Sequence, residues 1–333
     1  MAYCKKFVHL VVMFSSAEPL IECVPNFSEG RNQAVIDTIA DAIRQVPDVK
    51  LLHIDMGYDA NRTVYTFAGK PAAVAEAAFQ AVLTAAKLID MRQHHGEHPR
   101  MGACDVCPFI PVQHISMEEV IALSKSVGRR IGEHGIPVFL YEFSATSSER
   151  QNLAYLRKGE YEGISDKIMQ PEWQPDFGPQ LFHPTFGMLA LGARKFLIAY
   201  NVNLDTKDLQ LAKNIAREIR EMRMQSGNSK AQRTLQHVKA IGWWMEAYNC
   251  TQISTNITDI FESPIVEVFD IIRATADRFG VAVAGSELIG LIPEAALKHD
   301  RMSPQEVVSY LGLDSLKPFD LQERILERLL VKV

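Results

Sequence analysis

The chain has 333 residues, of which 47% are hydrophobic and 23% are charged, and its formal net charge is −5. This balance excludes a disordered chain, and the length suits two units of roughly 100–200 residues each. The small acidic excess argues against nucleic acid as a partner, so small-molecule chemistry is the first expectation.

Five cysteines are an odd and sparse set for this length: Cys4, Cys23, Cys104, Cys107 and Cys250. They predict reduced thiols and a cytoplasmic protein. Residues 1–19 form a leader or extension of uncertain status, because Lys5 and Lys6 precede a short apolar run, loosely as in a signal peptide. That run is too short to span a membrane, and Met13 is an alternative start.

Hydrophobic periodicity predicts an alternating order of elements in the first half of the chain. The expected strands are 20–24, 50–56, 62–67 and 105–112, and the expected helices are 32–46 and 71–89. The resulting order, βαββαβ, is that of the ferredoxin-like arrangement. A further helix at 117–133 and a strand at 136–143 extend it.

The second half repeats this order. Its expected strands are 196–202, 238–244, 252–257 and 281–284, and its expected helices are 207–222 and 265–279. The predicted fold class is therefore α/β (α+β), with two ferredoxin-like βαββαβ subdomains. Their sheets would be antiparallel or mixed, with helices on the outer faces and a cleft or tunnel between the subdomains, a usual place for a ligand.

Residues 144–192 between the halves lack a clear period and are rich in proline and aromatic residues. The composition favours an interdomain linker whose aromatic side chains pack onto both halves. A rigid aromatic loop that offers a flat apolar surface to a planar ligand is the functional alternative, because proline limits the entropy lost on binding.

The densest polar cluster lies at 94–107 and allows two interpretations. His94 and His98, with Cys104 and Cys107, could form a zinc site. Pro99 disfavours helical geometry at His98, and cysteines three apart in a strand should point to opposite faces, so core thiols are the better interpretation. The second interpretation is a single catalytic imidazole on a loop, and composition does not choose between His95 and His98.

A second polar group flanks the predicted hairpin turn at 57–61. Asp55 and Asn61 are of types that commonly form turns. Arg62 and Arg100 would suit a carboxylate-rich substrate, because a guanidinium group pairs bidentately with a carboxylate. No glycine-rich nucleotide motif is present.

Six strings of the sequence closely resemble the formiminotransferase domain family. They read ECVPNFSEG at 22–30, NRTVYTF at 61–67, GEHPRMGA at 96–103, PDFGP at 175–179, GARKFLIA at 192–199 and GLDSL at 312–316. The resemblance runs from about residue 20 to the C-terminus and implies a homodimeric enzyme. It also implies two α/β subdomains, 20–196 and 197–333, with folate bound in a tunnel between them.

The resemblance further implies site residues. The catalytic histidine would be His98, and no metal would be needed. The folate-binding stretch would be Gly178, Pro179, Gln180, Leu181, Phe182, His183, Pro184, Thr185, Phe186 and Gly187. The interior of this stretch departs from the animal proteins in several side chains, such as His183 and Phe186, so a backbone role is the safer expectation.

The implied activity is transfer of the formimidoyl group from N-formimidoyl-L-glutamate to N5 of tetrahydrofolate, a reaction of histidine degradation and one-carbon metabolism. We expect His98 to move the protons, Asp55 to orient it or the amidine, and Arg62 or Arg100 to hold a substrate carboxylate. The alternatives are a non-catalytic folate- or anion-binding module and a metal-dependent hydrolase.

After the string at 312–316 and the Pro318-Phe319 pair, the short segment 321–333 ends the given sequence. So short a tail cannot form the helical cyclodeaminase domain of the bifunctional animal enzymes, which predicts a monofunctional transferase that passes its product to a separate cyclodeaminase. The tail itself should form one helix, with Leu321, Ile325 and Leu329 on its inner face.

Overall fold

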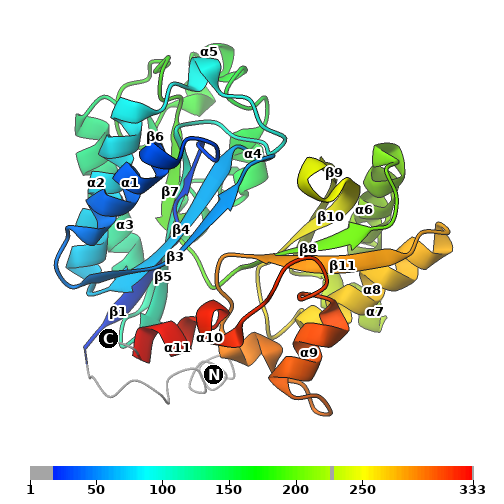
Figure 1. Ribbon diagram of the computed structural model, residues 1–333. Helices are drawn as coiled ribbons and strands as arrows, with labels where there is room; N and C mark the ends of the chain where they lie inside the picture. Colours follow the sequence, from blue (N-terminus) through cyan, green and yellow to red (C-terminus); the bar gives the residue numbers. More distant parts are fainter. Residues whose placement is uncertain (1–17, 226–228, 332–333) are drawn as a thin grey trace. The chain divides into compact units, whose positions relative to one another are not determined.

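The computed structural model describes residues 18–225 and 229–331, so the predictions of a leader and of Met13 as a start lie outside the described residues. These residues divide into two compact units, 18–194 and 195–331 (Figure 1). Among the described residues, no helix combines the length and the hydropathy needed to cross a membrane.

The first unit contains one mixed sheet. Its strands are β1 (Leu20–Cys23), β2 (Asn26–Phe27), β3 (Val49–Gly57), β4 (Arg62–Gly69), β5 (Cys104–Gln113), β6 (Val138–Leu140) and β7 (Leu189–Ala193). β1 and β2 lie between β4 and β5, and β3 lies outside β4, with all these pairs antiparallel. This is the ferredoxin-like order, so the predicted fold of the first half is confirmed. β7 and β6 add two parallel strands beyond β5.

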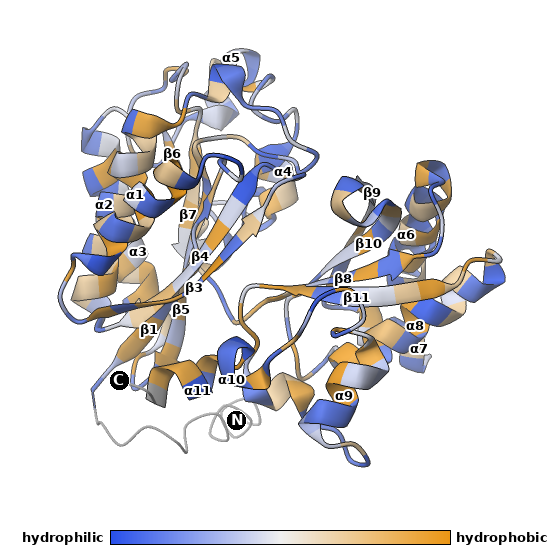
Figure 2. Cartoon of the chain, viewed as in Figure 1, coloured by the Kyte–Doolittle hydropathy of each residue, from blue (hydrophilic) through white to orange (hydrophobic). Residues whose placement is uncertain are grey.

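Helices cover one face of this sheet (Figure 1). The helices of the unit are α1 (Gln33–Arg44), α2 (Pro71–Leu88), α3 (Met117–Glu133), α4 (Leu153–Arg157) and α5 (Ile164–Lys167). Ile36, Ile39 and Ile43 of α1 are buried, as the predicted period of 3.6 requires. α1, α2 and α3 carry both hydrophobic and hydrophilic residues, as expected of helices with one buried side (Figure 2).

The proline-rich segment is part of the first unit, which corrects the interpretation as a linker. Leu156, Ile164, Trp173 and Phe186 are buried in the same hydrophobic core as the strands of the first sheet. The segment also supplies β7, which lies between β5 and β6. Sequence periodicity missed β7 because a five-residue strand with both faces buried shows no alternation.

The second unit repeats the fold. Its strands are β8 (Ile198–Leu204), β9 (Val238–Met245), β10 (Cys250–Ile257) and β11 (Val283–Ile289). They pair antiparallel in the order β11-β8-β10-β9, which is again the ferredoxin-like order and confirms the duplication. Its helices are α6 (Leu209–Met224), α7 (Lys230–Leu235), α8 (Ile265–Arg278), α9 (Pro304–Leu311), α10 (Leu321–Arg324) and α11 (Leu326–Val331).

Short 3-10 helices connect many of these elements. They are η2 (Met91–Gln93), η3 (Glu142–Ser144), η4 (Glu149–Gln151), η5 (Pro171–Trp173), η6 (Glu246–Tyr248) and η7 (Glu294–Leu297). The prediction of one continuous C-terminal helix is wrong, because Ile325 leaves the helix to bridge Ile292 and separates α10 from α11. Ile325 is fully buried as expected, but Leu330 rather than Leu329 completes the buried face.

Candidate functional site

Asn61 links the strings at 22–30 and 61–67 to His95, the residue directly before the string at 96–103. Its side-chain oxygen accepts a hydrogen bond from the backbone N–H of Gly30 (2.9 Å), and its amide nitrogen donates to the carbonyl of His95 (3.0 Å). Asn61 has a left-handed backbone (φ +45°), which asparagine adopts more readily than most residues. The turn between β3 and β4, the loop before α1 and the loop of residues 94–103 (the histidine loop) therefore meet at one side chain.

Glycines allow these loops to approach so closely. A side chain at Gly30 would bring its Cβ under 3.0 Å from the Gly57 carbonyl oxygen and the Arg62 nitrogen. A side chain at Gly96 would meet the Ala60 carbonyl in the same way. Both positions need glycine because backbone lies where a Cβ atom would stand.

His98 is partly buried, and its ring is oriented by the backbone next to it. Nδ1 lies 2.7 Å from the carbonyl oxygen of Pro99, which fixes the neutral ring with its proton on Nδ1 and its lone pair on Nε2. Burial, followed by the positive charges of Arg62 and Arg157, lowers the pKa of His98 well below its usual value. The imidazole is therefore neutral at physiological pH and can accept a proton at Nε2.

Asp105 lies at the centre of the charges around His98. Its fully buried carboxylate accepts hydrogen bonds from Arg62 (2.6 Å), from Arg157 (2.5 Å) and from the backbone N–H of Met101 (3.0 Å). Burial opposes ionisation of this carboxyl group, but Arg157 and Arg62 outweigh burial and hold its pKa well below the usual range. This cluster ties β4, β5 and α4 to the loop that carries His98.

His94 belongs to a separate network. Its Nε2 lies 2.7 Å from the carbonyl oxygen of Asn61, and its Nδ1 accepts a hydrogen bond from Nε of Arg100 (3.2 Å). Burial is the main cause that lowers the pKa of His94, so the ring is neutral. Both ring nitrogens are engaged within the protein, which removes His94 from the zinc site considered above.

The cysteines of that possible zinc site also lie elsewhere. Cys107 contacts both Cys104 and Cys23, with 3.7 Å between the sulfur atoms of Cys23 and Cys107, and all three are fully buried. The prediction that Cys104 and Cys107 face opposite sides of the strand is therefore wrong. The register between β2 and β5 shifts at Asp105, and an extra residue in a strand changes which side chains share a face.

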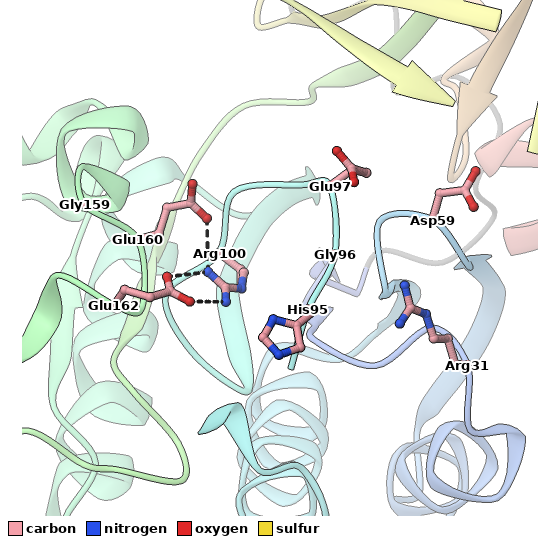
Figure 3. Close-up of a pocket in the computed structure, with 9 residues that line it drawn as sticks. All are labelled: Arg31, Asp59, His95, Gly96, Glu97, Arg100, Gly159, Glu160 and Glu162. Carbon is pink, nitrogen blue, oxygen red and sulfur yellow. Dashed lines mark hydrogen bonds and ion pairs between the residues drawn. The ribbon is translucent and has the colours of Figure 1, made fainter. Parts of the chain in front are cut away.

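A polar pocket opens beside the histidine loop, with a volume of about 560 Å³. It is lined by Arg31, Asp59, His95, Gly96, Glu97, Arg100, Gly159, Glu160 and Glu162. Figure 3 shows Arg100 with Glu160 and Glu162 on one side, Arg31 and Asp59 on the other, and His95 between them. The pocket offers positive and negative groups together, which suits a small ligand that carries both charges.

The two predicted carboxylate-binding arginines are paired inside the protein. Arg62 bonds Asp105 and, through Nε, Asn26 (3.0 Å). Arg100 pairs with Glu162 (2.6 Å) and Glu160 (3.1 Å). Their role towards a substrate stays a prediction.

Asp55 and Arg31 are a strand residue and a pocket residue with polar neighbours. Asp55 lies on β3 near His53, 3.7 Å from its Nε2, and its role also stays a prediction. Arg31 is the exposed arginine that lines the pocket; its Nε donates to the carbonyl of Tyr58 (3.2 Å), and its guanidinium lies over the Tyr58 ring (5.1 Å).

The predicted folate stretch, residues 178–187, lies next to the histidine loop. Gly187 bridges Gly102, and the backbone N–H of Ala103 donates to the carbonyl of Phe186 (2.7 Å). Tyr161 donates its hydroxyl to the carbonyl of Pro184 (2.5 Å) and packs its ring under Arg100, which lines the pocket. The structure thus brings this stretch, the pocket and the histidine loop into one region of the first unit.

Sequence reasoning missed Arg31, Asp105, Arg157 and the pair Glu160 and Glu162. Asp105 carried a usable signal, because an ionisable residue inside an apolar strand is buried only when it is paired. Arg157, Glu160 and Glu162 lie in the segment without a clear period, where no local pattern marked them.

Comparison with known proteins identifies the family. Residues 20–194 match the model of the formiminotransferase domain, N-terminal subdomain, and residues 199–302 match that of the formiminotransferase domain. The chain is 48% identical to formimidoyltransferase-cyclodeaminase of Mus musculus over 327 residues, which cover 93% of this chain and 60% of that protein.

Microbial relatives match over most of their own length. The chain is 44% identical to glutamate formimidoyltransferase of Streptococcus pyogenes serotype M1, over 92% of this chain and 97% of that protein. It is 42% identical to glutamate formimidoyltransferase of Thermoplasma acidophilum, over 84% of this chain and 89% of that protein. With both family models matched and both ferredoxin-like units formed, the chain belongs to the formiminotransferase domain family.

Proposed function

We propose that this protein is a glutamate formimidoyltransferase, which transfers the formimidoyl group of N-formimidoyl-L-glutamate to N5 of tetrahydrofolate. The observation that carries the proposal is the 44% identity to a protein of that name over 97% of its length. The neutral imidazole of His98 supports it at the level of chemistry; His98 does not itself line the pocket but directly follows Glu97, which does.

His98 would move both protons of the reaction. Nε2 accepts the proton that N5 loses when it bonds to the amidine carbon, and the same atom returns a proton to the departing glutamate nitrogen as the carbon–nitrogen bond breaks. Nδ1 keeps its own proton throughout because it donates to the Pro99 carbonyl. One group can therefore serve as base and then as acid, and no covalent enzyme intermediate is required.

The pocket would bind N-formimidoyl-L-glutamate. Arg31 is exposed at its edge and suits a substrate carboxylate, while Asp59, Glu97 and Glu160 suit the cationic amidine. Folate would bind along residues 178–187, where backbone groups and the ring of Phe182 lie beside Tyr161. A homodimer and a cytoplasmic location stay predictions from the family resemblance and the sparse cysteines.

Turnover by the purified chain tests the proposal. Incubation with N-formimidoyl-L-glutamate and tetrahydrofolate should produce 5-formimidoyltetrahydrofolate and glutamate in equal amounts, with and without a chelator. Binding of folate without product formation would favour the non-catalytic module, and loss of activity with chelator would favour the metal-dependent enzyme.

A further inference from the structure

Asp105 holds two arginines from distant parts of the first unit and one nearby backbone N–H at one carboxylate. Arg62 comes from β4, the Met101 N–H comes from the histidine loop, and Arg157 comes from α4, 52 residues away in sequence. The register shift between β2 and β5 falls at Asp105, and bulges of this kind re-aim side chains close to functional sites. The whole carboxylate is buried, so the contacts are protected from solvent screening.

The cluster of Arg62, Asp105 and Arg157 carries more positive than negative charge. Arg62 and Asp105 alone would be neutral, as an ordinary buried ion pair is. Arg157 adds a second guanidinium group, with its Nη2 2.5 Å from the same carboxylate oxygen and its side chain 15% exposed. Two guanidinium groups and one carboxylate leave a net positive charge, and the carboxylate is held by the Met101 N–H three residues after His98.

We propose that Arg157, held in place by Asp105, is a positioning residue for His98 whose charge keeps the imidazole neutral before reaction and makes it a strong proton donor afterwards. This inference rests on the proposed function only for its catalytic consequence. The charged groups that act on His98 are Arg62 from β4, Arg157 from α4 and Asp105 from β5, together with the Pro99 carbonyl.

The catalytic consequence follows from the order of proton transfers. Nε2 must be unprotonated to accept the N5 proton, and the imidazolium that forms must then give a proton to a departing amine nitrogen. A neighbouring positive charge favours the neutral ring in the first step and expels the proton in the second. The cost is a weaker base, which is tolerable because N5 gains acidity once it bonds to the amidine carbon.

The test removes the second positive charge and leaves the first. In Arg157→Gln the side chain can still donate a hydrogen bond to Asp105, whereas Arg157→Met loses the bond and the charge, and Arg157→Lys keeps the charge. Arg150→Met is the matched control, since Arg150 forms a buried ion pair with Asp176 (3.0 Å) in the same unit. All four variants are compared with the full-length wild type after their folding has been checked by circular dichroism.

Titration of the His98 ring by NMR, assigned with His98→Ala, gives a readout that does not depend on activity. The pKa of His98 should rise by roughly one unit in Arg157→Gln and Arg157→Met, and should stay near the wild-type value in Arg157→Lys and Arg150→Met. The acidic limb of the pH profile of kcat/KM should move to higher pH by the same amount in the same two variants.

Two results would overturn the inference. An unchanged His98 pKa in a folded Arg157→Gln protein would show that Arg157 does not act on the imidazole. An equal shift in Arg150→Met would show a general effect of losing a buried arginine. If the wild type shows no turnover but its His98 titrates as expected, the proposed function fails and the assignment of Arg157 stands.

Discussion

His98 and His94 lie four residues apart, but their immediate surroundings differ. The Pro99 carbonyl selects its tautomer, and burial with two neighbouring arginines keeps it neutral. His94, four residues earlier, is also neutral, but both its ring nitrogens are engaged by Asn61 and Arg100. His94 is therefore held at both ring nitrogens, whereas the proton transfer assigned to His98 stays a prediction.

His98→Ala should lower kcat by roughly 10²–10⁴-fold with little effect on folate affinity, because general acid–base catalysis is usually worth that much. Steady-state kinetics with both substrates measures this. His95→Ala, whose ring lines the pocket, should act mainly on the KM for N-formimidoyl-L-glutamate. His299→Ala, at an exposed position of the second unit, is the control. Wild-type kcat in His98→Ala would contradict the role of His98.

Arg31→Met should raise the KM for N-formimidoyl-L-glutamate by about 10-fold or more and leave the KM for tetrahydrofolate unchanged. Arg31 is the exposed arginine of the pocket, and a charge-assisted hydrogen bond to a carboxylate is worth about 1.5–3 kcal/mol. Arg31→Lys should recover part of the affinity. Arg44→Met, at a surface ion pair with Asp41, controls for loss of charge; a similar rise in that variant would count against Arg31.

Among the elements, β5 departs from the rule that successive side chains of a strand alternate between its two faces. Strict alternation predicts Cys104 and Cys107 on opposite faces, yet both lie in one thiol cluster. The register shift at Asp105 places an extra residue opposite β2, which depends on pairing with a strand about 80 residues earlier. Sequence within β5 contains no sign of that pairing.

The bridge between Gly102 and Gly187 couples the predicted folate stretch to the histidine loop. A Cβ atom at Gly187 would lie under 3.0 Å from the Met101 carbonyl oxygen, and Met101 binds Asp105 through its N–H. Gly187→Ala should therefore lower kcat as well as folate affinity, because it displaces the loop that carries His98. Urea unfolding and steady-state kinetics measure the two effects.

Gly135→Ala provides the matched control for that variant. Gly135 has the same left-handed backbone (φ +83° against +82° at Gly187), but a Cβ there would meet no atom within 4 Å. Both variants share a conformational cost of about 1–3 kcal/mol, and Gly187→Ala should lose about 1–3 kcal/mol more through the close contact. Equal losses in stability would mean that the Met101 backbone moves aside freely.

At the scale of the whole molecule, each unit has a core of its own. The first core contains residues between Ile21 and Ala193, and the second contains residues between Ile198 and Ile325. A fragment of residues 18–194 should therefore fold alone and unfold cooperatively, because a chain of this size buries enough apolar surface. Thermal unfolding followed by near-UV circular dichroism tests this, with the full chain as reference. A fragment without fixed tertiary signal would show that the second unit is needed for folding.

The sequence by itself determined the βαββαβ order in both units, because helix and strand periods depend on residues a few positions apart. Its unusual strings also singled out His98 and residues 178–187. Only the tertiary structure decided that Trp173 and Phe186 of residues 144–192 pack into the first core, that Arg62 and Arg157 share Asp105, and that Arg31 lines the pocket. These features join residues tens of positions apart through packing and burial, and local sequence patterns do not encode which distant partners meet.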